Sequence, residues 1–275
     1  MKSKRTCRNS RSITICILPA VVFFIMGCFN PPDISVPYFI PQSPPDSVIE
    51  RGIDAHPDNA IYIEWEEPAT AESEGILGYY VYRGILSGDE YDFKRIATVR
   101  RDASLLYDSD KYTDNTVHLD TTYYYYLRSY NDFTISKTTS DTVFYKLARK
   151  ASLIAPSGDI YENKPRFEFR YPTLIVDRIS YLYFRLYHFG SGGYSIKYFT
   201  KTHRFDLSKS QYFLYLNNTD AYTTVLLDSL WETPSTGKYL EKGNYRWRVD
   251  AVSGELGGGP ETVGSKSNWM YFTVK

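Results

Sequence analysis

The chain has 275 residues, with 32 Lys and Arg against 32 Asp and Glu, so its formal net charge is zero. This balance argues against a nucleic-acid-binding protein, which normally carries an excess of basic residues. Aromatic residues make up 17% of the chain and charged residues 23%, a composition that can bury a core and excludes wholesale disorder. The three cysteines, Cys7, Cys16 and Cys28, all lie near the N-terminus, which leaves no disulfide framework for the rest of the chain.

The first 27 residues have the pattern of a secretory signal peptide. Five basic residues and no acidic residue precede an apolar run over residues 13–26. As a helix this run would span about 21 Å, which is shorter than the ~30 Å hydrocarbon core of a bilayer. We therefore expect no permanent transmembrane anchor.

The apolar run ends in Ile25, Met26, Gly27 and Cys28, and these residues resemble the bacterial lipobox. The resemblance implies that residues 1–27 are removed and that Cys28 carries covalent lipid, including an acyl chain such as palmitate. Several acyl chains anchor a protein stably where one alone binds reversibly. A plain signal peptide with an incidental cysteine is the alternative. Loss of the leader's five basic residues would leave 27 basic and 32 acidic residues, a mildly acidic protein.

The resemblance also implies a place in the cell envelope, with the lipid anchor holding the protein to a membrane. Phe29 follows Cys28, whereas in some bacteria an aspartate at that place retains lipoproteins at the inner membrane. The outer membrane is therefore favoured, and whether the protein faces the periplasm or the outside stays open. We expect no cofactor other than the covalent lipid.

Residues 28–46 are expected to form a tether. Six prolines lie between residues 29 and 47, too many for a helix or a central strand: Pro31, Pro32, Pro37, Pro41, Pro44 and Pro45. In a polyproline II conformation this segment would reach up to about 60 Å from the bilayer.

The apolar residues that follow recur with the period of two that is typical of β-strands. Ile61, Ile63 and Trp65 alternate with polar residues, which places them on one face of a strand. Further strands are expected over residues 76–83, 93–99, 123–130 and 142–147. Short strands separated by turn residues predict an all-β sandwich.

Several motifs in this region together resemble a fibronectin type III domain over about residues 43–148, and we place the domain at residues 47–148. They are the Trp-Glu-Glu-Pro sequence that begins at Trp65, the strand over residues 76–83, the Tyr-Thr-Asp sequence that begins at Tyr112, and the Thr-Thr-Tyr sequence that ends at Tyr123, with Asn131 closing its strand. The resemblance implies that Trp65 is the core tryptophan of strand B. It also implies that Tyr123 is the tyrosine-corner residue at the start of strand F. Leu119 and Asp120 replace the usual Pro-Gly before this corner.

Residues 151–275 repeat the plan more loosely. Phe167, Phe169 and Tyr171 alternate, and strands are expected over residues 181–189, 194–199 and 270–274. Residues 240–251 look like the corner and strand F again, with Tyr245 in the place of Tyr123. The segment resembles fibronectin III or immunoglobulin-like sandwiches, with surplus length expected between residues 202 and 231. The predicted fold class is therefore all-β, with two tandem immunoglobulin-like sandwiches of the fibronectin type III type, close enough to pack.

No sequence motif indicates catalysis, so we expect a protein that is not an enzyme. A hydrolase is the alternative function class. No metalloprotease, nucleophile-elbow or phosphate-loop motif is present. His188 in an expected strand favours a structural histidine over a metal ligand. Asp108 and Asp110, with Asp114 four residues further on, lack the remaining positions of a calcium loop. They therefore indicate a solvated turn that leads into residues 112–114. Adjacent Glu66 and Glu67 point to opposite faces of a strand and cannot act together.

The candidate binding residues are aromatic. Tyr80 and Tyr82 are expected to point outward from one strand, and Tyr124, Tyr126, Arg128 and Tyr130 from the strand that pairs with it. Tyrosine and arginine are enriched in binding hot spots. The alternatives are a tyrosine ladder that only stabilises the sheet, and a face buried against the second sandwich.

These features predict a non-catalytic, lipid-anchored cell-envelope protein that serves as a binding or scaffold module for a protein or glycan partner. The alternative function is a glycan-capturing accessory lipoprotein of an outer-membrane uptake system, because exposed aromatic rings can stack on sugars.

Overall fold

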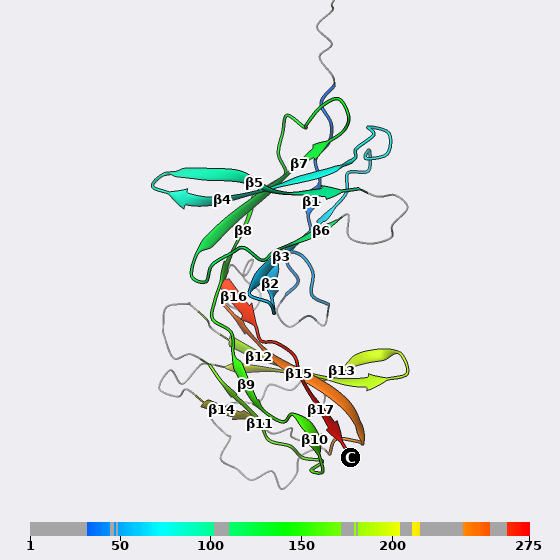
Figure 1. Cartoon of the computed structure of the whole chain (residues 1–275), viewed down its shortest axis with the longest axis vertical. Coiled ribbons are helices and arrows are strands. Elements are labelled where there is room, and N and C mark those ends of the chain that lie inside the picture. The colour runs from blue at the N-terminus through cyan, green and yellow to red at the C-terminus, as the bar shows by residue number, and fades with distance from the viewer. Residues whose placement is uncertain are drawn as a thin grey trace, which may run out of the picture. The chain divides into compact units, whose positions relative to one another are not determined.

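A computed structural model provides the structure of the chain (Figure 1), and all of its described elements are β-strands. It describes residues 32–44, 47, 49–101, 110–171, 179, 181–203, 211–214, 239–253 and 263–275, with backbone alone for residues 195–203 and 211–214. Cys28 and the predicted signal peptide lie outside these residues. Within the described ranges, no helix is long and apolar enough to cross a membrane.

The first sandwich consists of two antiparallel sheets. One sheet is built around β3 (Ala60–Glu66), which pairs with β1 (Tyr38–Phe39), β2 (Asp54–His56) and β6 (Lys111–Asp114). The other runs in the order β5 (Glu90–Arg100), β4 (Gly78–Ser87), β7 (Thr122–Tyr130) and β8 (Val143–Leu147). In the lettering of immunoglobulin-like folds, β3 and β6 correspond to strands B and E on one sheet, and β4, β7 and β8 correspond to strands C, F and G on the other.

The second sandwich repeats this plan. Its smaller sheet has the order β14 (Gln211–Leu214), β11 (Phe167–Arg170) and β9 (Ser152–Ala155). In the larger sheet β15 (Gly243–Val252) lies between β12 (Tyr181–Gly190) and the consecutive strands β16 (Val263–Lys266) and β17 (Met270–Val274). The outer strands are β13 (Gly193–His203), paired with β12, and β10 (Gly158–Ile160), parallel to β17. The predicted fold class, two tandem all-β sandwiches, is confirmed.

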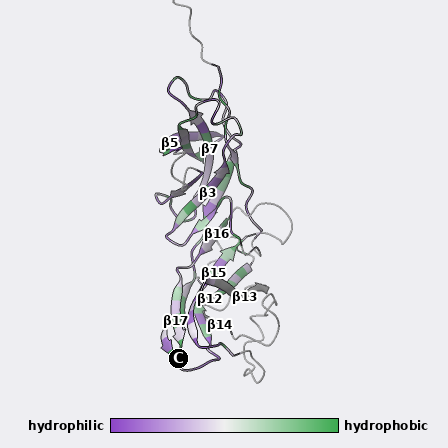
Figure 2. Cartoon of the chain, turned by 90° about the vertical axis from the view of Figure 1, so that its right-hand side faces the viewer, coloured by the Kyte–Doolittle hydropathy of each residue, from purple (hydrophilic) through white to green (hydrophobic). Residues whose placement is uncertain are grey.

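Each sandwich has its own hydrophobic core among the described residues. In the first, Trp65 is fully buried and packs edge-on against Tyr79, with ring centroids 5.8 Å apart. In the second, Trp247 is fully buried beside Phe167, with centroids 5.2 Å apart. Tyrosine is near the middle of the hydropathy scale, so the tyrosine-rich β7 is pale in Figure 2 although its residues alternate between buried and half-buried.

Both expected tyrosine corners are formed. The Tyr123 hydroxyl accepts a hydrogen bond from the backbone N–H of His118 at 3.0 Å. The Tyr245 hydroxyl donates to the backbone carbonyl of Glu241 at 2.9 Å. Asp120 takes the left-handed conformation, with φ of 63°, at the place where fibronectin type III domains usually have glycine. Aspartate tolerates this conformation better than most residues, so the corner keeps its turn without Pro-Gly.

Part of the predicted tether is instead packed on the first sandwich. Ile34 and Ile40 are buried, and the short strand β1 pairs with β3. The backbone N–H and hydroxyl of Ser35 both donate to the carboxylate of Glu74, at 2.6 and 2.9 Å. Prolines are tolerated beside a two-residue edge strand, and the isoleucines between them supply apolar area that can be buried. The described residues 33–44 therefore do not form a free stalk.

The larger sheets of the two sandwiches are joined into one hydrogen-bonded network. β16 pairs in parallel with β8, and Figure 1 shows β16, near the red end of the colour bar, beside the green β8. The backbone N–H of Ala148 donates to Gly264 O at 2.8 Å. A Cβ at Gly264 would lie 2.3 Å from the Tyr145 hydroxyl, so only glycine allows this approach. The short link after β8 thus continues directly into contact with the second sandwich.

Candidate functional site

The predicted aromatic face exists and is larger than expected. Each of its predicted members is half-buried, on the side of the sheet that faces away from the core: Tyr80, Tyr82, Tyr124, Tyr126, Arg128 and Tyr130. The structure adds residues from the neighbouring strands, namely Tyr91, Phe93 and Arg95 from β5 and Phe144 from β8. We call these ten residues the tyrosine platform.

The rings of the platform are held by stacking across the strands. Tyr80 stacks on Tyr130 with centroids 4.5 Å apart and 12° between the planes, and Tyr82 stacks on Tyr126 at 4.7 Å and 15°. The guanidinium of Arg95 lies 4.5 Å above the Tyr80 ring. Such pairs add about 0.5–1.5 kcal/mol beyond area burial. The platform is therefore an ordered surface, because each ring limits the rotation of the next.

Gly84 makes room for one of the rings. A Cβ at this position would lie 2.7 Å from the Phe93 ring, which crosses over the glycine and reaches Tyr126, with centroids 4.7 Å apart. Beyond it, Tyr91 packs edge-on against Tyr124, also at 4.7 Å. The sequence signal for this extension was a glycine inside a strand, which often marks a close approach by another group.

Two properties limit what the platform can do chemically. Burial, followed by the neighbouring Tyr82, raises the pKa of the Tyr126 hydroxyl, and burial and Tyr80 raise that of Tyr130. These two hydroxyl groups therefore stay neutral at physiological pH. Arg128 donates through its guanidinium to the backbone carbonyl of Ser136, with Nε at 2.8 Å, so it is engaged by its own loop. The platform therefore offers aromatic surface and hydroxyl groups, together with the exposed side chain of Arg95.

The ring contacts of the platform favour two of the three expected roles. In the described part of the chain, all of its aromatic contacts are made within residues 80–144. None involves the second sandwich, so the reading of a face buried against that sandwich receives no support. A ladder that stabilises the sheet and a surface that binds a partner are compatible with the same geometry. Tyr91 and Phe144, at opposite edges, are 51% and 40% exposed and leave ring area free for a partner.

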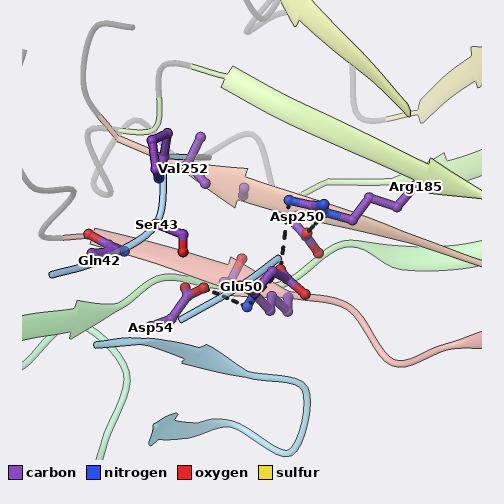
Figure 3. Close-up of a pocket in the computed structure, with 11 residues that line it drawn as sticks. Gln42, Ser43, Glu50, Asp54, Arg185, Asp250 and Val252 are labelled. Carbon is purple, nitrogen blue, oxygen red and sulfur yellow. Dashed lines mark hydrogen bonds and ion pairs between the residues drawn. The ribbon is translucent and has the colours of Figure 1, made fainter. Parts of the chain in front are cut away.

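A second constellation was not expected from the sequence: a buried charge cluster where the two sandwiches meet (Figure 3). It contains three acidic and three basic side chains from distant parts of the chain: Glu50, Asp54, Arg185, Arg248, Asp250 and Lys266. Figure 3 labels Glu50, Asp54, Arg185 and Asp250 among them. Glu50 and Asp54 come from the first sandwich, and the other four come from β12, β15 and β16. No local pattern in the sequence links residues so far apart, which is why sequence reasoning missed the cluster.

Asp250 is the centre of this charge cluster. Arg185 Nε donates to its Oδ2 at 2.7 Å, and Arg248 Nη2 donates to the same oxygen at 3.0 Å. Arg248 Nε lies 2.8 Å from Oδ1 without a hydrogen-bonding angle, so that contact is an ion pair only. Each of these three side chains is at most 5% exposed.

Glu50 and Lys266 extend the charge cluster toward the first sandwich. Arg248 donates to Glu50, and Lys266 Nζ contacts Glu50 Oε1 at 2.9 Å and Asp54 Oδ2 at 2.5 Å. Burial alone would raise the pKa of Glu50, but the charges of Arg248, Lys266 and Arg185 outweigh it and hold this pKa at about 2. Beside these groups is a cavity of about 20 Å³, enough for one water molecule. The Glu50 carboxyl group is thus ionised at neutral pH, and the cluster fills the contact between the two sandwiches rather than forming a substrate site.

The remaining sequence candidates have structural partners. Asp114 ends β6, the strand into which the expected turn leads, and its fully buried carboxylate accepts hydrogen bonds from Arg83 at 2.8 Å and from the Tyr125 hydroxyl at 3.0 Å. Glu67 accepts from Arg101 at 2.8 Å. His188 packs on the Tyr245 ring at 4.7 Å. Asp108 and most of residues 202–231 lie outside the described residues. Within the described ranges, no group of side chains is placed to hold a metal ion.

Comparison with known protein families and with curated proteins finds no match. Solved structures that resemble the chain include a fibronectin III-like protein from Clostridium thermocellum, 23% identical over 40% of this chain and 92% of that one, with a TM-score of 0.26. The FN1–FN3 domains of chicken CNTN1 are 10% identical over 89% of this chain and 68% of theirs, with a TM-score of 0.32. A two-domain fibronectin type III segment of chicken tenascin is 13% identical over 87% of this chain and 98% of that segment, with a TM-score of 0.25.

Proposed function

We propose that the chain is a non-catalytic binding or scaffold module of the bacterial cell envelope, which presents the tyrosine platform to a protein or glycan partner. The observation that carries this proposal is the platform itself: ten residues from four adjacent strands form one ordered aromatic surface. Preordered rings lose little conformational entropy when a partner binds. The joined sheets and the buried charge cluster support the scaffold role.

Attachment to the membrane is the second part of the proposal, and it rests on the lipobox-like sequence that ends at Cys28. We expect cells that express the full chain to incorporate labelled palmitate into it, and Cys28→Ser to abolish this label. The same variant should move the protein from the membrane fraction to the soluble fraction. Label that persists in Cys28→Ser would contradict lipidation at this residue.

The platform is tested by changing four of its rings together, Tyr80, Tyr82, Tyr124 and Tyr126, to alanine in the full chain in detergent. Binding is measured by a glycan array and by capture of envelope proteins from the same cells. We expect the substitutions to weaken binding of the partner at least about 30-fold, because one aromatic hot spot alone contributes about 2 kcal/mol or more.

Tyr161→Ala is the matched control, because this tyrosine is 85% exposed and outside the platform, and it should leave binding unchanged. Thermal unfolding checks that the four-alanine variant remains folded. Binding that survives all four substitutions rules out the platform as the binding surface, and the ladder role then remains. A glycan ligand on the array favours the glycan-capturing alternative, whereas capture of an envelope protein alone favours the protein-binding role.

A further inference from the structure

The outward face of the second sandwich carries a different aromatic group, centred on one arginine. Arg246 on β15 lies opposite Tyr271 of β17 on one side and Tyr187 of β12 on the other. Its guanidinium carbon is 4.2 Å from the ring centroids of Tyr194 and Trp269, and 5.3 Å from that of Tyr187. We call Arg246 with these four aromatic residues the arginine cage.

Arg246 differs from the other two arginines on this face. Arg185 and Arg248 share the carboxylates of Asp250 and Glu50. Among the residues that the structure describes, Arg246 has no acidic partner, and its buried Nε has no hydrogen-bond acceptor. The side chain as a whole is only half-buried. The cage therefore holds an uncompensated positive charge at the surface.

The rings prepare this arginine for a planar anion. Aromatic neighbours attract the guanidinium through the electrostatic field of their faces and fix its orientation without neutralising it. A guanidinium is a rigid fork of donors that matches both oxygens of a carboxylate, and such charge-assisted pairs are stronger than neutral hydrogen bonds. Because the fork is already held, little side-chain entropy is lost when a carboxylate binds.

We propose that the arginine cage binds an acidic sugar, a uronate unit of a glycan, with its carboxylate on Arg246 and its ring beside the exposed Tyr271. The composition of the cage favours this ligand, because one positively charged side chain without an acidic partner among the described residues lies among four aromatic rings. One of these rings, Tyr271, is 52% exposed and can therefore contact a sugar ring. A uronate matches this composition, because it carries one carboxylate on a sugar ring whose C–H faces can pack against an aromatic ring. Acidic peptides and polyphosphates are instead matched by clusters of free basic residues.

The test is calorimetric titration of the full chain in detergent with an oligogalacturonate, and with its methyl ester as the neutral counterpart. We expect the oligogalacturonate to bind and the methyl ester to bind at least about tenfold more weakly. Arg246→Gln should weaken the oligogalacturonate at least about tenfold and leave the methyl ester unaffected. Arg246→Lys keeps the charge but loses the fork, so its affinity should fall between the two.

Arg95→Gln tests the tyrosine platform instead, because Arg95 lies above a tyrosine ring of that surface. Arg170→Gln is the matched control, because Arg170 is exposed on β11, outside both the cage and the platform. It should leave oligogalacturonate binding unchanged. Loss of binding in Arg95→Gln with retention in Arg246→Gln would move the acidic sugar to the platform and overturn the inference while leaving the proposed function intact. The inference is equally overturned if wild type binds no oligogalacturonate, or if it binds polyglutamate as tightly.

Discussion

Asp250→Ala should lower the free energy of unfolding by about 3–5 kcal/mol, because it leaves two buried guanidiniums without the carboxylate they share. Arg185 and Arg248 are 3% and 5% exposed, so bulk water does not solvate either guanidinium. Glu50 alone would then face both arginines. The loss is measured by urea unfolding followed by circular dichroism, with wild type as the reference.

Two further variants separate charge from packing in this experiment. Arg185→Met added to Asp250→Ala should recover part of the loss, because it removes one uncompensated charge. Asp159→Asn is the control, since Asp159 is 57% exposed in its pair with Lys275, and such pairs contribute about 0–1 kcal/mol. An Asp250→Ala protein as stable as Asp159→Asn would show that the cluster does not hold the joint.

The stabilising contribution of Glu50 to the charge cluster should be lost only in strong acid. The pKa of Glu50 falls from 4.5 to about 2 on folding, so its contribution is complete above about pH 4.5 and is lost as the pH falls through about 2. The shift corresponds to stabilisation of roughly 3 kcal/mol at neutral pH. Urea unfolding of wild type repeated at descending pH should therefore show the joint persisting through mildly acidic conditions.

Trp247→Ala should be the second most damaging substitution, with a loss of roughly 3–5 kcal/mol. The side chain is fully buried among Phe167, Phe184 and Phe272, and its Nε1 donates to the backbone carbonyl of Pro156 at 3.1 Å. Because the sandwiches have separate cores, the loss falls on the second one. We expect urea unfolding to separate into two transitions, with the second sandwich unfolding first.

A pair of phenylalanine variants provides the control for Trp247. Trp65 in the first sandwich is equally buried, but its Nε1 has no hydrogen-bond partner among the described residues. Trp65→Phe removes volume only, whereas Trp247→Phe also removes a hydrogen bond that contributes about 1 kcal/mol. Trp247→Phe should therefore be the more damaging of the two. Equal losses, with a single unfolding transition in Trp247→Ala, would contradict the role assigned to this indole.

The sequence predicts those parts of the fold that depend on local alternation. In β7, Tyr123, Tyr125 and Leu127 point inward and the residues between them outward, as a period of two requires. The pairing of β7 with β4 followed from the resemblance to fibronectin type III domains, and it brought the six predicted platform residues together. Residues of β5 were missed because a bulge at Val81 and Tyr82 shifts the register between β4 and β5.

Features that depend on distant contacts could not be predicted from the sequence in this way. Charged residues such as Glu50 and Lys266 read as ordinary surface residues until the fold brings them within 2.9 Å. The proline-rich segment was assigned to a tether from its composition, yet two isoleucines between the prolines find places in the core. Arg246 is likewise recognisable only when the rings around it come from three strands and the loop before β17.

The parallel pairing of β8 with β16 also bears on association between molecules. In an isolated first sandwich the free edge of β8 would present unpaired backbone groups, and exposed strand edges are templates for aggregation. Here Val263 and Gly264 occupy that edge opposite Lys146 and Leu147. The second sandwich therefore prevents this edge of the first sandwich from pairing with another copy of the chain, which lowers the tendency to aggregate where copies are crowded.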